Sequence, residues 1–398
     1  MDVVVLGGGG LTGRCAVRDL AESQVFDHVR VADLDLELAR SAAARAGGGP
    51  RVSAHRVDVR DPAAMADVLA GARVCVNAVQ YTFNLEVMEA CRRAGVDYLD
   101  FGGLFHMTRK QLAHDSEFRD AGRLAIPGFG QVPGISNVLA RAAVEGLSEV
   151  DAVVVRDAWK DLTVGGPELV FTWSPSTFLD EMMLPAVAWV DGDYREFPPM
   201  SDPEQYTFPP PIGAVTLFRT LHSEPATLPS YLPGVAPRTV EWREGGSGIE
   251  VMRLLALLGL GEERPLSVDG RPIAPRRLLL ALLKDRHLLG YPEGVQVDDV
   301  EVSDIEVRGR GADGPVTRHA SAVFHSRPDW GAAATEYAVG IAGSIGAILI
   351  ARGQAEGTGV VPPERAIPPG PLREMLRSRG VVTRISPPEA PLASLARP

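Results

Sequence analysis

The sequence has few cysteines, only three lysines and no recognisable metal-binding or hydrolase motif. Its cysteines, Cys15, Cys75 and Cys91, show no C-x-x-C spacing, and two of them lie in apolar segments. This arrangement predicts buried free thiols in a reducing compartment rather than disulfides or metal ligands. The eight histidines are scattered, without H-E-x-x-H or Cys/His spacing, so we predict no metal site. The G-x-S-x-G nucleophile elbow of many hydrolases is also missing.

The sequence also lacks a long apolar run and a surplus of positive charge. The longest apolar stretch, residues 338–351, is short and rich in glycine, so we expect no membrane span. The chain starts directly with a strand-like segment, without a basic leader or a cleavage site, and we expect a cytoplasmic protein. With 51 acidic and 40 basic residues the net charge is −11, which disfavours nucleic acid as a partner. One or two local arginines can still bind an anionic substrate.

The first part of the chain alternates between short strand-like and helix-like segments. Strands are predicted at residues 3–6, 29–32, 52–59, 74–78, 98–99 and 124–126, and helices at 13–22, 36–45, 62–70 and 85–94. Such alternation is typical of βαβ units with a parallel sheet. We therefore predict an α/β fold with an N-terminal, doubly wound Rossmann domain over residues 1–128.

The pattern changes after Gly128. Strand-like alternation recurs at residues 150–158, 215–221, 295–308 and 321–324, with irregular segments between them, and predicts an α+β domain with a mainly antiparallel sheet over residues 129–330. Residues 191–211 are dense in proline, aspartate and aromatic residues, which suggests a long, partly ordered loop. A helix at 336–352 is expected within a C-terminal segment, 331–380. A tail follows at 381–398, and we expect it to be frayed from Pro387 onward.

A glycine turn near the N-terminus predicts a dinucleotide site. The segment Val3–Arg14 reads as a strand, a glycine turn and the start of a helix. Such a turn brings backbone N–H groups and a helix N-terminus against a pyrophosphate, an approach that side chains would block. Three registers of the motif coexist: Gly7/Gly10/Gly13, Gly8/Gly10/Gly13 and Gly7/Gly9/Gly13. We favour the first, because Gly7 directly ends the strand and Leu11 and Thr12 complete the turn.

The end of the next strand supports the same site. Asp33 lies twenty residues after Gly13, where a carboxylate can accept hydrogen bonds from both ribose hydroxyls. Leu34 and Asp35 follow it, and no arginine stands there to pair with a 2′-phosphate. We therefore predict NAD as the cofactor, with NADP as the alternative.

Further cofactor contacts are expected where the third and fourth strands end. Asp58 and Val59 end the third strand and would border the adenine pocket, although a cap of the following helix is an equal alternative for Asp58. Asn77, Ala78 and Val79 end the fourth strand, at the edge where a doubly wound sheet exposes its ligand.

Four stretches of the chain together resemble the saccharopine dehydrogenase family in its broad sense, which includes lysine 6-dehydrogenases and carboxynorspermidine synthases. They are the turn Gly7–Arg14, similar to the phosphate loop of that family, Ala94–Gly103, similar to "aGvhYvDlgG", Pro127–Asn137, similar to "G-x-x-PG-x-x-N", and Gly359–Glu364, similar to "GV-x-PPE". The glycine loop alone is common, whereas the combination is specific. The "DFGG" after Tyr98 looks more like the lysine 6-dehydrogenase branch. Val132 stands where members that handle saccharopine often have aspartate.

The resemblance implies a three-part plan and a class of reaction. The plan is a Rossmann domain, an inserted α+β domain for substrate and dimer contacts, and a C-terminal segment that returns to the first domain. The implied reaction is hydride transfer at a carbon that bears nitrogen, in an amino acid or polyamine, by an expected homodimer.

Oxidation of an amine by hydride loss requires a proton acceptor near the nitrogen and a site dry enough to spare the imine. Asp100 ends a strand beside Gly102 and Gly103, where a carboxylate can orient an ammonium group or accept its proton; a turn or cap role is the alternative. Tyr98 would share a strand face with Asp100 and contact substrate, or belong to the core. His106 follows these glycines closely and is a second catalytic candidate, since histidine commonly serves as a general acid or base; a surface histidine is the alternative.

The second part of the chain offers another candidate pair and two anchors. His222 and Glu224 are expected on one face at the end of an alternating strand, where they can close over the nicotinamide. A hydrogen bond inside the sheet is the alternative. Lys160 and Arg243 are candidate anchors for a substrate carboxylate, and solvated surface is the alternative for each.

Together these features predict an NAD(P)-dependent oxidoreductase that acts on CH–NH or CH–NH2 groups of a small amino acid or diamine. The alternatives are reduction of a C=O or C=C bond and a non-catalytic NAD-binding protein. Turnover of amine substrates, followed by NADH absorbance, separates the three.

Overall fold

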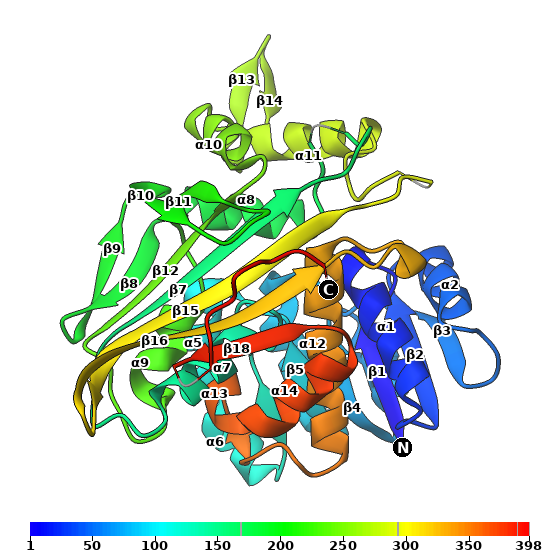
Figure 1. Cartoon of the computed structure of the whole chain (residues 1–398). Coiled ribbons are helices and arrows are strands. Elements are labelled where there is room, and N and C mark those ends of the chain that lie inside the picture. Colours follow the sequence, from blue (N-terminus) through cyan, green and yellow to red (C-terminus); the bar gives the residue numbers. More distant parts are fainter. Residues whose placement is uncertain (168, 293, 388, 398) are drawn as a thin grey trace.

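The computed structural model describes residues 1–167, 169–292, 294–387 and 389–397 and contains two large β-sheets (Figure 1). The first sheet is parallel, with the strand order β17-β6-β5-β4-β1-β2-β3. Its part of the chain runs β1 (Asp2–Leu6), α1 (Leu11–Ser23), β2 (His28–Asp33), α2 (Leu36–Arg45), β3 (Val52–Arg56), α3 (Pro62–Leu69), β4 (Ala72–Asn77), η1 (Tyr81–Phe83), α4 (Asn84–Ala94), β5 (Asp97–Asp100), α5 (Leu104–Leu112), α6 (Asp115–Asp120) and β6 (Leu124–Ile126). The order reverses between β1 and β4, as in doubly wound nucleotide-binding sheets. The predicted Rossmann fold is confirmed.

The second sheet has nine strands in the order β10-β11-β12-β7-β15-β16-β18, with β8 between β12 and β9. Its part of the chain runs α7 (Ile135–Val144), β7 (Glu149–Asp161), α8 (Pro175–Met183), β8 (Ala186–Val190), β9 (Asp193–Phe197), β10 (Ser201–Thr207), β11 (Ala214–Arg219), α9 (Glu224–Tyr231), β12 (Thr239–Gly246), α10 (Ile249–Leu257), β13 (Leu266–Val268), β14 (Arg271–Ile273), α11 (Pro275–Asp285), β15 (Asp299–Gly311), β16 (Gly314–His325) and η2 (Pro328–Trp330). All its pairs are antiparallel except β7 with β12. The predicted α+β part with a mainly antiparallel sheet is confirmed.

The last part of the chain returns to the first sheet and then crosses to the second. It runs α12 (Ala334–Ala351), β17 (Gly359–Val360), α13 (Pro363–Ala366), α14 (Pro369–Ser378) and β18 (Val382–Ser386). Strand β17 extends the first sheet beside β6, and β18 pairs with β16 of the second. The largest apolar cluster runs from β1 and α1 through α12 to β15 and β16, so the two sheets share one core. The predicted domain limits themselves stay predictions.

Two expectations about irregular segments are wrong. Residues 191–211 contain β9 and β10, because these short polar strands find partners in β8 and β11. Within the described residues 389–397, the tail packs back on the protein. Leu395 is 1% exposed, and its N–H donates to the Pro210 carbonyl oxygen at 2.7 Å. In both cases contacts with distant parts of the chain order a segment that has weak local preferences.

By length and composition alone, helix α12 could cross a membrane. It begins at Ala334, four residues before the apolar stretch, and has 18 residues, but 83% of that length is buried inside the protein. Figure 1 shows it alongside α1. A Cβ atom on Gly340 would lie 2.8 Å from the Thr12 carbonyl oxygen, so glycine permits the close contact. We therefore assign α12 as a core helix of the fold.

The three cysteines are buried and free. Cys15 lies on α1, Cys75 on β4 and Cys91 on α4. Burial raises the pKa of the Cys15 and Cys91 thiols, which keeps them protonated. The prediction of buried, unpaired thiols is confirmed.

Candidate active site

The glycine turn forms a backbone cradle at the start of α1. Gly7 has φ +68°, and a Cβ atom there would lie 2.7 Å from the Ala78 carbonyl oxygen. A Cβ atom on Gly13 would overlap the Gly7 carbonyl oxygen and lie 3.0 Å from the Gly8 Cα. Gly10 donates its N–H to the Gly7 carbonyl oxygen at 3.0 Å and borders open space on its other side. The arrangement fits a pyrophosphate. Cβ atoms on Gly8 and Gly9 would also meet neighbours, at 2.8 and 2.6 Å, so the choice among the three registers stays a prediction.

Asp33 lies next to this cradle at the end of β2. One carboxylate oxygen accepts the Gly9 N–H at 3.0 Å, and the other accepts the Asp35 N–H at 3.1 Å. Because the side chain is partly exposed and held beside the turn, it fits the predicted role of ribose acceptor. The neighbouring Leu34 is exposed at the same edge.

Asp58 does not cap the helix that follows it. Its carboxylate pairs with the Arg60 guanidinium at 2.9 and 2.7 Å, and this hydrogen bonding lowers the pKa of Asp58 to about 2. The cap of α3 is Asp61, which accepts the N–H groups of Ala63 and Ala64. The cap alternative for Asp58 is therefore wrong. An adenine-side role for Asp58 and the following Val59 stays a prediction.

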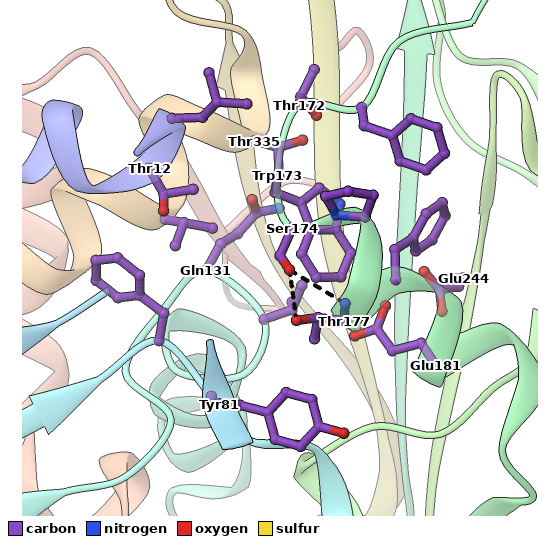
Figure 2. Close-up of a pocket in the computed structure, with 18 of the residues that line it drawn as sticks. Thr12, Tyr81, Gln131, Thr172, Trp173, Ser174, Thr177, Glu181, Glu244 and Thr335 are labelled. Carbon is purple, nitrogen blue, oxygen red and sulfur yellow. Dashed lines mark hydrogen bonds between the residues drawn. The ribbon is translucent and has the colours of Figure 1, made fainter. Parts of the chain in front are cut away.

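A cavity of about 450 Å³ extends from the glycine turn to the second sheet (Figure 2). Its Rossmann side is formed by residues at the carboxyl edge of the first sheet, namely Gly10, Leu11, Thr12, Ala78, Val79, Gln80, Tyr81, Phe101, Gly102 and Gly103. The opposite side is formed by β7, β12, β15, α8 and the segment before α8. Ala78 and Val79 thus lie where the sequence placed them. Asn77 lies just behind, where its side chain donates to Asn84 and Tyr98 and accepts the Val79 N–H.

Four buried carboxylic acids line the far side of this cavity. On the second sheet, Glu244 of β12 is the register partner of Asp157 of β7, and Asp157 is the partner of Ser303 of β15. Glu301 lies two residues before Ser303 and therefore on the same face. Glu181 reaches the group from α8 (Figure 2). All four are at most 4% exposed, and the described lining includes no lysine and no arginine.

The surroundings of these acids favour their neutral form in the free protein. Burial raises the pKa of all four carboxyl groups, Asp157, Glu181, Glu244 and Glu301. Neighbouring carboxylates add to the rise for Asp157 and Glu181. A cation that enters the cavity would reverse this balance, because an opposite charge at close range favours the ionised form.

His222 and Glu224 lie together beside these four acids, Asp157, Glu181, Glu244 and Glu301, which we call the acidic row. The His222 ring stacks on Trp242 at 3.7 Å with an interplanar angle of 10°. Its Nδ1 hydrogen bonds to Glu224, the first residue of α9, and its Nε2 lies 3.5 Å from Glu181 Oε1. Glu224 also accepts the Ser136 hydroxyl at 2.9 Å. Because Glu224 takes the Nδ1 side, the imidazole presents Nε2 toward the cavity, which His222 lines.

Asp100 does not line the cavity, and its buried carboxylate instead holds together the backbone and side-chain groups around it. It is 1% exposed, and its two oxygens accept four hydrogen bonds, from Tyr98, Gln111 and the N–H groups of Gly102 and Gly128, at 2.6 to 2.8 Å. Burial raises the pKa of Asp100, and these bonds oppose the rise. The turn role, the alternative to catalysis, fits this geometry. Tyr98 is a core residue whose hydroxyl donates to Asp100.

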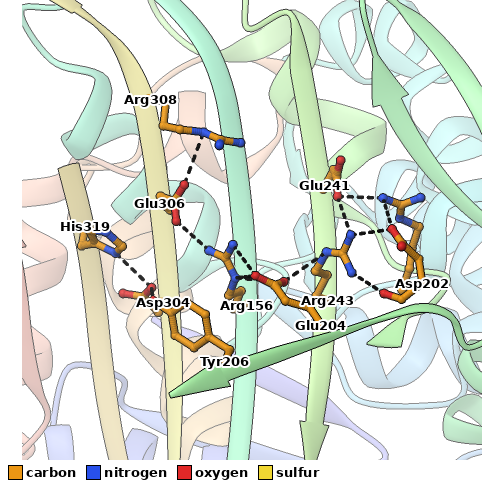
Figure 3. A network of polar contacts seen from close by, with 11 residues as sticks. Arg156, Asp202, Glu204, Tyr206, Glu241, Arg243, Asp304, Glu306, Arg308 and His319 are labelled. Atoms are coloured by element: carbon orange, nitrogen blue, oxygen red, sulfur yellow. Dashed lines mark hydrogen bonds and ion pairs between the residues drawn. The ribbon is translucent and has the colours of Figure 1, made fainter. Parts of the chain in front are cut away.

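His106 and the two predicted carboxylate anchors also lie outside the cavity lining. His106 is exposed on α5. Lys160 and Arg243 project from the opposite face of the second sheet, because strand alternation separates them from Asp157 and Glu244. Lys160 donates to the Pro211 carbonyl oxygen at 2.7 Å, and Arg243 pairs with Asp202, Glu204 and Glu241, as Figure 3 shows. We therefore omit them from the proposed site.

The acidic row and Gln131 were missed by the sequence reasoning. None of the four acids carried a clear signal, because β7 and β15 contain several other charged residues and Glu181 and Glu244 also lie in mixed segments. Burial distinguishes these acids, and a buried acid is costly unless it serves a polar network or a ligand.

Comparison with known proteins gives the following similarities. Residues 3–126 match the saccharopine dehydrogenase NADP binding domain, and residues 130–381 match the saccharopine dehydrogenase C-terminal domain. A carboxynorspermidine synthase from Vibrio alginolyticus is 27% identical over 223 residues, 53% of this chain and 53% of that protein. A carboxyaminopropylagmatine dehydrogenase from Synechocystis is 24% identical over 294 residues, 71% of this chain and 72% of that protein. The chain thus spans about half the length of the first of these relatives.

The fold is also that of a solved structure. Apo saccharopine dehydrogenase (L-Glu forming) from Saccharomyces cerevisiae superposes with a TM-score of 0.71 and 19% identity, covering 97% of this chain and 99% of that one. At this identity the likeness concerns the fold. The match over residues 3–126 confirms the predicted nicotinamide dinucleotide domain.

Proposed function

Because the chain belongs to the saccharopine dehydrogenase family, we propose that it is an NAD(P)-dependent oxidoreductase that transfers a hydride at a carbon–nitrogen bond of an amine. The observation that carries this proposal is the single cavity that joins the glycine turn to His222 and a row of buried carboxylic acids. Acidic groups without a lysine or an arginine among the described lining suit an ammonium group better than an anionic substrate. The names of two relatives, carboxynorspermidine synthase and carboxyaminopropylagmatine dehydrogenase, also denote amines.

The proposed reaction assigns the proton to His222. When bound, the coenzyme supplies the hydride acceptor or, in the reverse direction, the hydride donor. In the oxidative direction the C–H bond yields its electron pair as hydride, the nitrogen loses a proton to His222 Nε2, and the C=N bond forms. Glu224 holds the imidazole in the orientation that this transfer needs, since it occupies the Nδ1 side. In the reductive direction His222 Nε2 returns the proton to the substrate nitrogen.

The buried setting supports the same assignment. His222 is 5% exposed and is covered on one face by Trp242, so bulk water has little access to the nitrogen that faces the cavity. Exclusion of water protects an imine from hydrolysis. Glu181, close to Nε2, is placed to hold the ammonium form of the substrate before its proton leaves.

Coenzyme preference is proposed from Asp33. A carboxylate beside the ribose accepts from a 2′-hydroxyl and repels a 2′-phosphate, which favours NAD over NADP. A small amine or amino acid is the proposed partner of the site. The homodimer and the cytoplasmic location expected from the sequence stay predictions, and light scattering in solution checks the first.

A coupled test uses absorbance at 340 nm and a matched pair of histidine variants. The protein is assayed with both coenzymes against a panel of amines, amine–aldehyde mixtures, keto acids and enoyl compounds. We expect turnover with amines or imines only, and a loss of about 10²- to 10⁴-fold in kcat for His222→Gln. His106→Gln, an exposed histidine outside the cavity lining, is the control and should retain wild-type activity. Activity confined to keto or enoyl compounds, or full activity of His222→Gln, would contradict the proposal.

A further inference from the structure

The cavity has a second part, which is lined by apolar side chains and which the proposed proton transfer does not use. It is formed by the segment before α8, by α8 and α10, and by the stretch after α11. We call it the apolar wall, and its residues are Leu169, Phe171, Trp173, Phe178, Met252 and Leu289.

Contacts within the protein hold the apolar wall in place. Phe171 forms two backbone hydrogen bonds, of 2.9 and 2.8 Å, with the residues on either side of Leu289. The Phe178 ring packs against the rings of Trp173 and Phe171, with centroids 5.3 and 6.3 Å apart. The wall is therefore a built surface whose aromatic members support one another.

Few polar groups interrupt this surface. The hydroxyl and the N–H of Thr177 both donate to the Ser174 hydroxyl oxygen, at 3.0 and 3.3 Å, so these two lining residues are hydrogen bonded to each other (Figure 2). The residues that define the apolar wall carry no charge, and the described cavity lining contains no lysine or arginine. A carboxylate of the substrate would therefore find no cationic side chain at the wall and would lose its hydration there.

The apolar wall begins close to the proposed site of proton transfer. Glu181 Oε1 lies 3.5 Å from His222 Nε2. Phe178 precedes Glu181 by three residues on α8, and both line the cavity. Residues with this spacing lie on the same face of a helix, with Cβ atoms about 5–6 Å apart. A hydrocarbon group near the reacting nitrogen can therefore contact the wall while that nitrogen lies at His222.

The apolar wall costs free energy as long as water covers it. Leu289 is 41% exposed, and Trp173 is half-buried. The gain from covering such surface with hydrocarbon rises with the area that is removed from water. The coenzyme is expected along the carboxyl edge of the first sheet, on the other side of the cavity, so it leaves the wall to the substrate.

We infer that the apolar wall binds a hydrocarbon group of the substrate, an alkyl chain or an aromatic ring near the reacting nitrogen. This inference rests on the proposed function, because it takes His222 as the position of that nitrogen. The substrate is then an amine, or the imine formed from it, that has an apolar part. Selection by the size of this part comes from Trp173 and Leu289, while His222 and Glu224 carry out the proton transfer.

The test compares monoamines that differ only in their apolar part. The series from n-propylamine to n-hexylamine adds one methylene at a time, and 5-aminopentan-1-ol has the length of n-hexylamine with a hydroxyl in place of the terminal methyl group. Calorimetry measures the binding of each amine to protein saturated with NADH, which cannot oxidise an amine, and fluorescence measures the binding of NADH. The variants are Trp173→Ala and Leu289→Ser. Trp189→Ala, which changes a half-buried tryptophan outside the described cavity lining, is the matched control.

We expect the affinity of wild type and Trp189→Ala to rise about threefold with each methylene, or about 30-fold from n-propylamine to n-hexylamine. n-Hexylamine should bind about tenfold more tightly than 5-aminopentan-1-ol, because the wall offers the hydroxyl no partner. In Trp173→Ala and Leu289→Ser the rise along the series should fall to about tenfold or less, with the affinity for n-propylamine within about twofold of wild type.

Two results would overturn the inference and leave the proposed function intact. They are a wild-type affinity that stays constant along the series and an equal rise in wild type and both variants. Leu289→Ser, which changes a partly exposed side chain, supplies the result if Trp173→Ala does not fold. If wild type binds NADH but none of the amines, the inference and the proposed function both fail.

Discussion

Replacing Gly10 and Gly13 separately should distinguish the contribution of the glycine turn to coenzyme affinity from its contribution to stability. Gly10 caps α1 with φ −71° and ψ 170°, a conformation that alanine adopts readily, and its new Cβ atom would lie 3.3 Å from the Gly7 carbonyl oxygen. A shift of a few tenths of an ångström relieves this contact. We expect Gly10→Ala to lower the free energy of unfolding by about 1 kcal/mol or less, most of it from the poorer cap.

The same methyl group stands where backbone must approach the coenzyme. Gly10 lines the cavity at the N-terminus of α1, so a Cβ atom there occupies space next to the pyrophosphate position. We expect coenzyme affinity to fall about 10- to 100-fold, which corresponds to about 1.4 to 2.8 kcal/mol.

Gly13→Ala is the contrasting variant. Its Cβ atom would overlap the Gly7 carbonyl oxygen and lie 3.0 Å from the Gly7 carbonyl carbon, and these are backbone atoms that cannot rotate away. Helix α1 would have to move from the turn and from α12, which packs on it. We expect a loss of about 3 kcal/mol in unfolding free energy, at the upper end of overpacking effects.

Chemical denaturation and fluorescence titration with NADH measure both quantities for the two variants. The reasoning predicts a folded Gly10→Ala with weak coenzyme binding and an unstable Gly13→Ala. Wild-type coenzyme affinity in Gly10→Ala would refute a register that contains Gly10. Wild-type stability in Gly13→Ala would refute the close packing of α1 on the turn.

Three further predictions concern single carboxylates. Asp33→Ala should weaken NAD binding about tenfold and reduce the preference of the protein for NAD over NADP, because it removes a charge-assisted acceptor at the ribose. Titration with both coenzymes measures the two affinities, and an unchanged affinity for NAD would contradict the prediction. Asp100→Asn should lower the free energy of unfolding by about 2 to 3 kcal/mol, since the amide cannot accept all four hydrogen bonds. Chemical denaturation at pH 7 measures this loss, and an unchanged free energy of unfolding would show that the carboxylate is dispensable. Burial raises the pKa of Glu364 from 4.5 to about 7, so its folded form retains a proton that the unfolded chain loses. The contribution of Glu364 to the free energy of unfolding should therefore fall by about 3 kcal/mol as the pH rises from about 4.5 through 7. Denaturation at pH 5 and pH 8 measures this fall, which Glu364→Gln should lack. An equal change of unfolding free energy with pH in wild type and Glu364→Gln would refute the prediction.

The dinucleotide half of the site was predictable because its determinants are local. The strand, the turn and the start of α1 are consecutive in sequence, and Asp33 follows at the end of the next strand. Each glycine has a backbone reason that a motif can express. His222 and Glu224 were predictable on the same grounds, since only one residue separates them.

The substrate half was not predictable in the same way, because it is assembled across strands. Asp157, Glu244 and Glu301 come from three parts of the chain, and the register of β7, β12 and β15 places them side by side. No local pattern encodes that register. Lys160 failed as a candidate for a related reason: it was expected after a strand that ends at residue 158, whereas β7 continues to Asp161 and the strand alternation turns Lys160 away from the cavity.

The most direct test of the account is to follow the hydride itself. The protein is incubated with coenzyme deuterated at the transferable position of the reduced nicotinamide, together with 1,4-diaminobutane and a panel of aldehydes, and the products are analysed by mass spectrometry. The account predicts one deuterium on a carbon bonded to nitrogen, and a rate of labelling about 10²- to 10⁴-fold lower when His222 is replaced by glutamine. Deuterium on a carbon bonded to oxygen or to carbon only, or no transfer with any pair, would contradict it.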